Sequence, residues 1–369
     1  MSEHLSLATY RTLGRSGLRV SPLSLGTMTF GSDWGWGADE REARQIFDAY
    51  VEQGGNFIDT ANLYTNGTSE QLVGAFANGR RNYLVIATKY TLATRADDPN
   101  SGGNHRKCMV HSVEMSLRRL ATEYIDLLYV HAWDSTTPVE EVLRAMDDLV
   151  RSGKVLYLGI SNTPAWQVSR MQAIADLRGW TPLIALQIEF NLIERTAERD
   201  LIPMALEMGL GVIPWSPLAS GLLADKYSKA DLGSPGDPVA SRKDGLIARG
   251  ELSSRSLAIV DVVKSVASDV GKTPAQVSLA WLLLNSTVTS PIIGARTLRQ
   301  LQENLGALDV TLTDAQRSRL SEASSIQLGF PHDHLAWLAT TPFMSPGISG
   351  TRWNGRLTSA LSSCIARFP

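Results

Sequence analysis

Eight short apolar segments alternate with amphipathic segments between about residues 20 and 300, and this alternation predicts an α/β chain folded as a single (β/α)8 barrel. Most of these segments are apolar throughout, as expected of parallel strands that are buried on both faces. The GxGxxG fingerprint is absent from the turn after the first strand, which weakens the alternative of an open, doubly wound sheet. Eight strand–helix units therefore favour the closed (TIM) barrel.

The expected elements follow one another regularly along the chain. The expected strands are Leu23–Met28, Asn56–Thr60, Leu84–Lys89, Ile125–His131, Val155–Ile160, Ile184–Glu189, Val212–Trp215 and Val288–Ile293. The expected helices are Glu40–Gln53, Glu70–Asn78, Arg106–Leu120, Val139–Arg151, Ala165–Leu177, Ala197–Glu207, Pro274–Asn285 and Leu298–Ala307.

Three further segments lie around this core pattern. Tyr10–Leu13 and Leu18–Ser21 flank a Gly-Arg-Ser-Gly turn and predict a β-hairpin before the barrel. Residues 224–250 are polar and predict a long connection between elements. We expect residues 1–330 to form the barrel and residues 331–369 to form a C-terminal extension, either flanking the substrate pocket or flexible.

Composition and charge exclude several classes of protein. A net charge of −2 gives no surface for a polyanion, so no nucleic acid partner is expected. Two cysteines far apart in sequence make neither a disulfide framework nor a metal motif. The N-terminus lacks a signal-peptide pattern and no apolar stretch is long enough to span a membrane, so we expect a cytoplasmic protein with no membrane partner. The sequence leaves the oligomeric state open.

Ionisable side chains stand at the ends of three successive expected strands. Asp59 follows Asn-Phe-Ile, Lys89 follows Val-Ile-Ala-Thr, and His131 follows Leu-Leu-Tyr-Val. In a (β/α)8 barrel the reacting residues come from the C-terminal ends of the strands. Tyr64 lies five residues after Asp59, and together these four residues predict a catalytic group. Ser161, Asn162, Gln187 and Trp215-Ser216 lie at the ends of later strands.

Several segments resemble the aldo-keto reductase family. They are GGNFIDTANLY (54–64), Lys89, YIDLLYVHAWD (124–134), GISN (159–162), LQIEFN (186–191), PWSPLASGLL (214–223) and PIIGARTLRQLQEN (291–304). The resemblance covers roughly residues 9–330, and the motifs match in order and spacing. It implies a catalytic tetrad of Asp59, Tyr64, Lys89 and His131, and an extended nicotinamide dinucleotide that is bound without a Rossmann fold.

The chemistry of carbonyl reduction fits this tetrad. The cofactor delivers a hydride to carbon, and the protein supplies a proton to oxygen. A phenol with a pKa of about 10 is a poor acid near neutrality unless a cation stabilises its anion. Lys89 would supply that cation to Tyr64, and Asp59 would hold the lysine charged. His131 would orient the carbonyl oxygen.

The resemblance also implies the residues that hold the cofactor. Those expected at the nicotinamide end are Gly26, Thr27, Met28, Asp59, Ser161, Asn162, Gln187 and Trp215, the last by stacking. Those expected at the pyrophosphate are Ser216, Pro217, Leu218, Gly221, Leu223 and Lys226. Those expected at the adenosine end are Gly294, Arg296, Gln300 and Asn304, where the N-terminus of the helix at Leu298 would add its dipole. We expect NADP(H) to be preferred over NAD(H), because the Arg296 guanidinium suits a 2′-phosphate.

The substrate is expected to be a small carbonyl compound bound over Tyr64 and His131. The aromatic loop that contains Trp34 and Trp36 suits a flat or apolar compound, and Trp133 could form the opposite wall. A surface-packing role for these tryptophans is nearly as compatible with the sequence. The family's usual ending cannot be followed beyond Pro331, so the sequence says least about substrate specificity.

Two other functions remain open at this point. Potassium-channel beta subunits resemble this family and keep a similar tetrad, so a cofactor-binding sensor or regulatory partner with little turnover is the main alternative. A metal-dependent barrel hydrolase or isomerase is weak, because the strand ends lack the histidine and carboxylate clusters of such sites, and no metal is expected. Sugar carbonyls, aromatic aldehydes and quinones all remain possible substrates.

Overall fold

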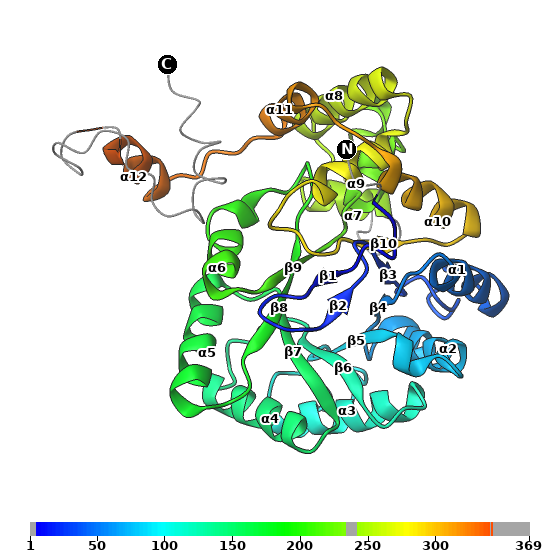
Figure 1. Cartoon of the computed structure of the whole chain (residues 1–369), viewed down its shortest axis with the longest axis vertical. Helices are drawn as coiled ribbons and strands as arrows, with labels where there is room; N and C mark the ends of the chain where they lie inside the picture. The colour runs from blue at the N-terminus through cyan, green and yellow to red at the C-terminus, as the bar shows by residue number, and fades with distance from the viewer. Residues whose placement is uncertain (1–4, 234–241, 340, 342–369) are drawn as a thin grey trace.

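The computed structural model describes residues 5–233, 242–339 and 341, and its centre is a nearly closed barrel of eight parallel strands (Figure 1). In sheet order the strands are β10 (Ile292–Gly294), β3 (Ser24–Gly26), β4 (Phe57–Asp59), β5 (Val85–Tyr90), β6 (Ile125–Val130), β7 (Val155–Ser161), β8 (Leu183–Glu189) and β9 (Gly211–Trp215). The ring closes where the amide of Thr289 donates to the carbonyl of Val212 at 2.8 Å. The predicted (β/α)8 barrel is confirmed.

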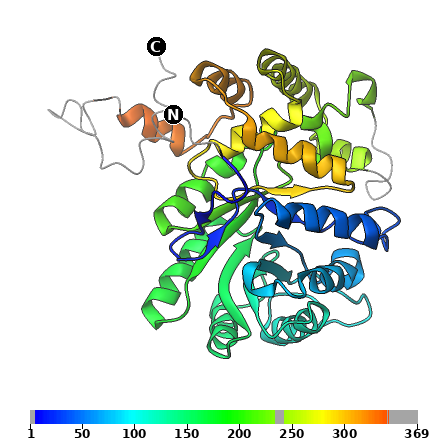
Figure 2. The same cartoon turned by 45° about the vertical axis from the view of Figure 1, so that its right-hand side comes forward.

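Helices other than the last, α12, surround the strands on the outside (Figure 2). They are α1 (Glu40–Glu52), α2 (Thr68–Ala77), α3 (Arg106–Arg119), α4 (Val139–Arg151), α5 (Ala165–Arg178), α6 (Leu201–Met208), α7 (Arg242–Ala248), α8 (Ser254–Val270), α9 (Pro274–Leu283), α10 (Leu298–Leu305), α11 (Asp314–Ala323) and α12 (His332–Ala339). No helix within the described ranges is both long and apolar enough to traverse a lipid bilayer.

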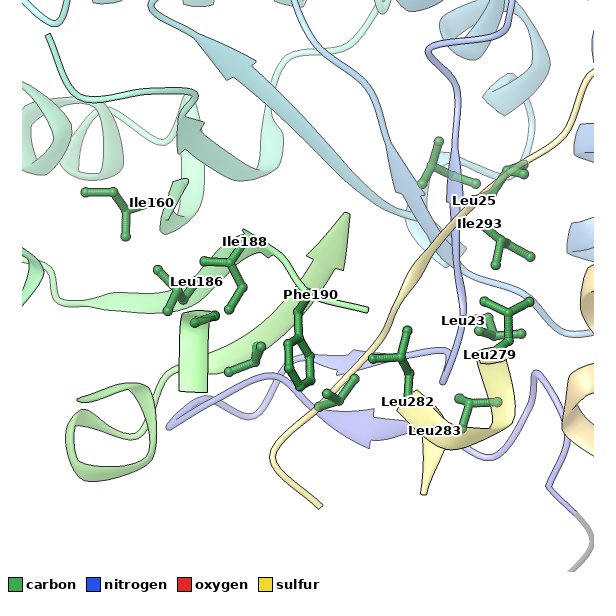
Figure 3. Close-up of a cluster of buried hydrophobic side chains, with 14 of the residues drawn as sticks. Leu23, Leu25, Ile160, Leu186, Ile188, Phe190, Leu279, Leu282, Leu283 and Ile293 are labelled. Carbon is green, nitrogen blue, oxygen red and sulfur yellow. The ribbon is translucent and has the colours of Figure 1, made fainter. Parts of the chain in front are cut away.

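The buried apolar side chains form two layers that follow from the alternation of residues along a strand. The larger layer lies between strands and helices, where Leu279 and Leu283 of α9 lie near Leu23 and Ile293 (Figure 3). The smaller layer contains the side chains inside the barrel, among them Phe57 and Leu127. This inner layer makes the barrel a packed core with no open channel.

The predicted hairpin, β1 (Arg11–Thr12) with β2 (Arg19–Val20), is present. Leu13 and Val20 are fully buried in the inner layer of the barrel. The turn lies against the start of β9: the amide of Arg15 donates to the Gly209 carbonyl at 2.8 Å, and a Cβ on Gly14 would lie 2.2 Å from the Ile184 carbonyl oxygen. The hairpin therefore covers the N-terminal end of the strands, which leaves the opposite end for a ligand.

The last third of the chain contains helices that were not expected from the sequence. Two of them are α8 and α11, although Leu257, Val260 and Val263 have the spacing of a helix face and a capping box at Ser253 starts α8. A short helix, α7, lies inside the connection predicted for residues 224–250, of which 234–241 lie outside the described residues.

Other boundaries also differ from the expected ones, among them those of the first and last barrel strands. The helix expected from Ala197 begins only at Leu201, after a separate 3-10 turn at Thr196–Glu198. In the extension expected at 331–369, α12 is described, and residues 340 and 342–369 lie outside the described residues. Figure 1 shows α12 standing away from the barrel.

Candidate active site

A cavity of about 770 Å³ opens at the C-terminal ends of the strands. Its floor includes Gly26, Asp59 and Trp215, which are the last residues of β3, β4 and β9. A (β/α)8 barrel gathers residues from distant parts of the chain at this face, because every strand ends there. None of the described residues of the C-terminal extension lines the cavity.

A buried ion pair lies at the base of the cavity. Lys89 is fully buried, and its ammonium Nζ donates to Asp59 Oδ1 at 2.5 Å, to the Thr60 carbonyl at 2.8 Å and to Tyr64 Oη at 3.2 Å. Burial alone lowers the pKa of Lys89, but Asp59 and Tyr64 outweigh that effect, so the pKa of the ammonium is raised. Lys89 therefore carries its charge at neutral pH.

The phenol of Tyr64 lies between this ion pair and the cavity. Burial raises the pKa of Tyr64 above its ordinary value, and the charge of Lys89 opposes that rise. The phenol is consequently protonated near neutrality. Its ring meets the edge of His131 with centroids 6.0 Å apart and an angle of 80° between the planes.

His131 follows β6 and is neutral. Burial, with a smaller contribution from the charge of Lys89, lowers the pKa of His131 to about 3. Ring nitrogen Nδ1 is buried and has no hydrogen-bond partner among the described residues. The His131 carbonyl accepts a hydrogen bond from Asn162 Nδ2 at 2.9 Å, which joins the loop after β6 to the end of β7.

Amide side chains extend this network across the barrel. Gln187 Nε2 on β8 donates to Asp59 Oδ2 at 2.8 Å, so both oxygens of Asp59 are bonded. Trp215 Nε1 donates to Asn162 Oδ1 at 3.2 Å. The amides of Gln187 and Asn162 each keep a second N–H, and each amide oxygen keeps a lone pair, so both side chains can still bind a ligand. Ser161 Oγ is buried without a hydrogen-bond partner in the part of the chain that the structure describes.

The structure gathers most of the sequence-predicted residues around this one cavity. Those that line it are Gly26, Met28, Trp34, Asp59, Tyr64, His131, Asn162, Gln187, Trp215, Ser216, Pro217, Leu218, Gly221, Lys226, Gly294, Arg296, Gln300 and Asn304. Those that do not line it are Thr27, Trp36, Lys89, Trp133, Ser161 and Leu223. Lys89 reaches the cavity through Tyr64, whereas Leu223 is fully buried in the apolar core.

The segment expected at the adenosine end lies along one wall of the cavity. Arg296 is exposed there, and its amide donates to Gln300 Oε1 at 2.8 Å. Asn304 Nδ2 donates to the Gly294 carbonyl at 3.2 Å. The first amide of α10, on Leu298, already donates to Glu42 Oε1 at 2.6 Å. The carboxylate of Glu42 thus occupies a donor at the helix terminus that we expected to face phosphate.

The aromatic loop forms a second wall. Trp34 lines the cavity and its ring lies 5.7 Å from that of Trp36, centroid to centroid, so Trp36 backs Trp34 from outside. Met28 and Leu92 also line the cavity and are each 39% exposed. Trp133 packs against the apolar core instead.

Three charged residues of the cavity wall were missed. Glu189 lies two residues after Gln187 on β8, a spacing that places both on one face of a strand and could have indicated it. Burial, with Glu251 and Glu194 nearby, raises the pKa of Glu189 to about 7, and Arg249 opposes that rise. Glu303 precedes Asn304 in α10, and Arg249 follows a helix that the sequence analysis did not predict.

Comparison with known proteins gives one consistent result. Residues 22–325 match the aldo/keto reductase family. The chain is 38% identical to the aryl-alcohol dehydrogenase [NADP(+)] of Phanerodontia chrysosporium, over 86% of each chain. It is 36% identical to the norsolorinic acid reductase of Aspergillus flavus, over 94% of this chain and 89% of that one. It is 40% identical to the uncharacterized oxidoreductase YrpG of Bacillus subtilis, over 82% of this chain and 92% of that one.

The lowered pKa of His131 predicts a contribution to acid sensitivity. Its pKa falls from 6.5 to about 3 on folding, so below pH 6.5 the unfolded chain takes up a proton that the folded ring does not. The contribution of His131 to the free energy of unfolding is therefore fully present above pH 6.5 and is lost as the pH falls below that value. His131→Gln should reduce the loss of unfolding free energy between pH 7 and pH 5 by about 1–2 kcal/mol, measured by urea denaturation. An unchanged pH dependence in the variant would contradict a neutral His131.

Proposed function

The chain belongs to the aldo/keto reductase family and is an NAD(P)H-dependent oxidoreductase, and we propose that it reduces an aldehyde or ketone with NADPH as its cofactor and Tyr64 as its proton donor. The same residues, run in reverse, oxidise the corresponding alcohol. Carbonyl reduction in general agrees with the family and with the names of the relatives.

The observation that carries this proposal is the set of hydrogen bonds made by Lys89. An ammonium has three donors, and those of Lys89 go to Asp59, Thr60 and Tyr64. The Tyr64 oxygen therefore accepts from Lys89, and its own proton is free to point toward the cavity. A phenol held in this way is a proton donor whose anion will meet a cation 3.2 Å away.

The residues of the cavity fit a nicotinamide dinucleotide. When bound, the cofactor supplies the hydride. Asn162 and Gln187 line the cavity and offer hydrogen bonds to the carboxamide. Ser161 Oγ is buried, unpaired among the described residues and next to Asn162 in sequence, so it would meet the carboxamide only where the ligand reaches past the cavity lining. The indole of Trp215 is held by Asn162 at the cavity wall, and one of its faces is available for stacking on the nicotinamide ring.

The loop after β9 fits the pyrophosphate. Ser216, Pro217, Leu218 and Gly221 line the cavity together with Lys226. Gly221 has a φ of +99°, and a Cβ at this position would lie 2.8 Å from Cδ of Lys226. Glycine thus lets the lysine side chain lie directly against the backbone that faces the cavity, where its charge favours phosphate.

Proton delivery then follows from the positions of Tyr64 and His131. The carbonyl oxygen of the substrate lies between the phenol of Tyr64 and His131 and accepts a hydrogen bond from each. Since Nδ1 of His131 is buried, Nε2 is the ring nitrogen that serves the substrate. As negative charge grows on the oxygen, the Tyr64 proton moves to it, and Lys89 stabilises the phenolate that remains.

We propose that the substrate is flat and apolar near its carbonyl group. Trp34, Met28 and Leu92 line the cavity and supply apolar surface there, and Met28 and Leu92 are exposed. An aromatic ring of the substrate would cover this surface. The name of one relative, an aryl-alcohol dehydrogenase, agrees with an aromatic compound.

Replacing the phenol tests the proton donor. Tyr64→Phe keeps the ring and should keep the dissociation constant for NADPH within about twofold, while kcat for an aromatic aldehyde falls about 10²–10⁴-fold. The matched control is Tyr83→Phe, which removes a phenol oxygen from a turn before β5, at the opposite end of the barrel. Turnover by Tyr64→Phe above about half of the wild-type rate would overturn the proposal.

Replacing Arg296 tests the cofactor preference. Its guanidinium suits the 2′-phosphate that distinguishes NADPH from NADH, and a charge-assisted contact is worth about 1.5–3 kcal/mol. Arg296→Ala should raise KM for NADPH about tenfold or more and leave KM for NADH within about twofold. Arg299→Ala, which changes an exposed neighbour that does not line the cavity, is the control. Equal effects on both cofactors would assign phosphate recognition elsewhere.

A further inference from the structure

The backbone immediately after Tyr64 has an unusual conformation. Thr65, Asn66 and Gly67 have φ angles of 45°, 57° and 97°, so three consecutive residues are left-handed. Glycine adopts this region freely and asparagine adopts it more readily than most residues. Threonine is β-branched, and a β-branched residue at positive φ is an outlier that persists only where its surroundings hold it.

The hydroxyl of Thr65 supplies that hold. Thr65 is fully buried; its Oγ1 donates to the Phe30 carbonyl at 2.7 Å and accepts from the amide of Ser69 at 3.0 Å. The N-cap of α2 is Gly67, which has no side chain to satisfy the first amides of the helix. Thr65 therefore takes over the capping of α2 from a position three residues before the helix begins.

The same segment is joined to the aromatic loop at two further points. Trp34 Nε1 donates to Asn66 Oδ1 at 3.3 Å, and Thr68 Oγ1 donates to Asp33 Oδ1 at 3.0 Å. A Cβ on Gly31 would lie only 3.1 Å from Thr65 Oγ1, so the two segments are in close contact. Three hydrogen bonds therefore join the two segments. The one from Thr65 to the Phe30 carbonyl is buried, and those of Trp34 and Thr68 are exposed.

We propose that Thr65 is a positioning residue that fixes the orientation of the Tyr64 phenol and the position of the Trp34 loop relative to that phenol. This inference rests on the proposed role of Tyr64 as the proton donor. Thr65 touches no reacting atom. It acts because its hydroxyl determines the turn from which Tyr64 projects.

One hydroxyl would thereby link the proton donor to a wall of the substrate pocket. If the hydroxyl is lost, the Phe30 carbonyl and the Ser69 amide lose a buried partner, and the left-handed turn is free to relax. Tyr64 and Trp34 would then shift relative to each other. A displacement of about 1 Å at a reacting group can cost on the order of 10²-fold in rate.

Three substitutions of Thr65 separate the hydroxyl from shape and from backbone strain. Thr65→Val keeps the branched shape and loses the hydroxyl, so kcat should fall about tenfold or more and KM for an aromatic aldehyde should rise. Thr65→Ser keeps the hydroxyl and should restore kcat to within about twofold of the wild type. Thr65→Gly suits the left-handed backbone but lacks the hydroxyl, so it should lose kcat as the valine variant does.

Binding of NADPH, measured by fluorescence titration, should remain within about twofold of the wild type in all three variants, because Thr65 does not line the cavity. Thr181→Val is the matched control: it removes a hydroxyl that donates to Asp147 at 2.9 Å near the start of β8, and kcat should not change.

Two results would overturn the inference. One is that Thr65→Val and Thr65→Gly keep kcat within about twofold of the wild type. The other is that Thr65→Ser loses as much kcat as Thr65→Val. Where the valine variant does not fold, the glycine variant decides by the same criterion. Tyr64→Phe is measured in parallel, because high turnover in that variant contradicts the proposed function itself. A failure of the Thr65 variants alone contradicts only the positioning role of Thr65.

Discussion

The buried ion pair between Lys89 and Asp59 is the interaction on which the site depends. The side chains are 0% and 4% exposed, and in such a place either charge alone would be costly. Removing one partner of a buried pair typically costs about 3–5 kcal/mol, because the other charge is left uncompensated. The pair is stable here because Thr60, Tyr64 and Gln187 satisfy the remaining donors and acceptors. The Tyr64 phenol thus accepts one of the hydrogen bonds that make the buried charge of Lys89 tolerable.

The barrel strands bring the charged groups and His131 together, and the turn after β4 adds Tyr64. Asp59, Lys89 and His131 come from β4, β5 and the residue after β6, which are neighbours in the sheet. Gln187 reaches Asp59 from β8, across the top of the inner apolar layer. Because the hairpin covers the other end of the strands, the polar groups inside the described barrel open to the large cavity at this end.

Much of this arrangement could be predicted from the sequence, since it depends on periodicity and strand order. The apolar strands, most of the helices before residue 215 and the strand-end positions of Asp59, Lys89 and His131 follow from local patterns. The hydrogen bonds that decide the chemistry do not. Nothing in the sequence indicates that Gln187 donates to Asp59, because 128 residues separate them and only barrel closure brings them together.

Three other residues have roles that could not be predicted, because those roles depend on tertiary contacts. Thr65 looks like an ordinary turn residue, and only its φ angle and its two hydrogen bonds distinguish it. Arg249 lines the cavity, although it lies in the segment that was expected to be a polar connection. Glu42 lies in the first turn of α1, yet it satisfies the first amide of α10, which is 256 residues away. Tertiary contacts assign these roles, and local sequence does not encode them.

The central claim is that Asp59 and Lys89 act through Tyr64 as one proton-delivering unit. A double-mutant cycle of Asp59→Asn, Lys89→Met and the double variant, read as kcat for an aromatic aldehyde at saturating NADPH, tests it most directly. If the two residues act as one unit, each single change should lower kcat strongly, and the double change should cost little more than the worse single change. Losses that multiply, so that the two free-energy effects add, would show that Asp59 and Lys89 do separate work and would contradict the account.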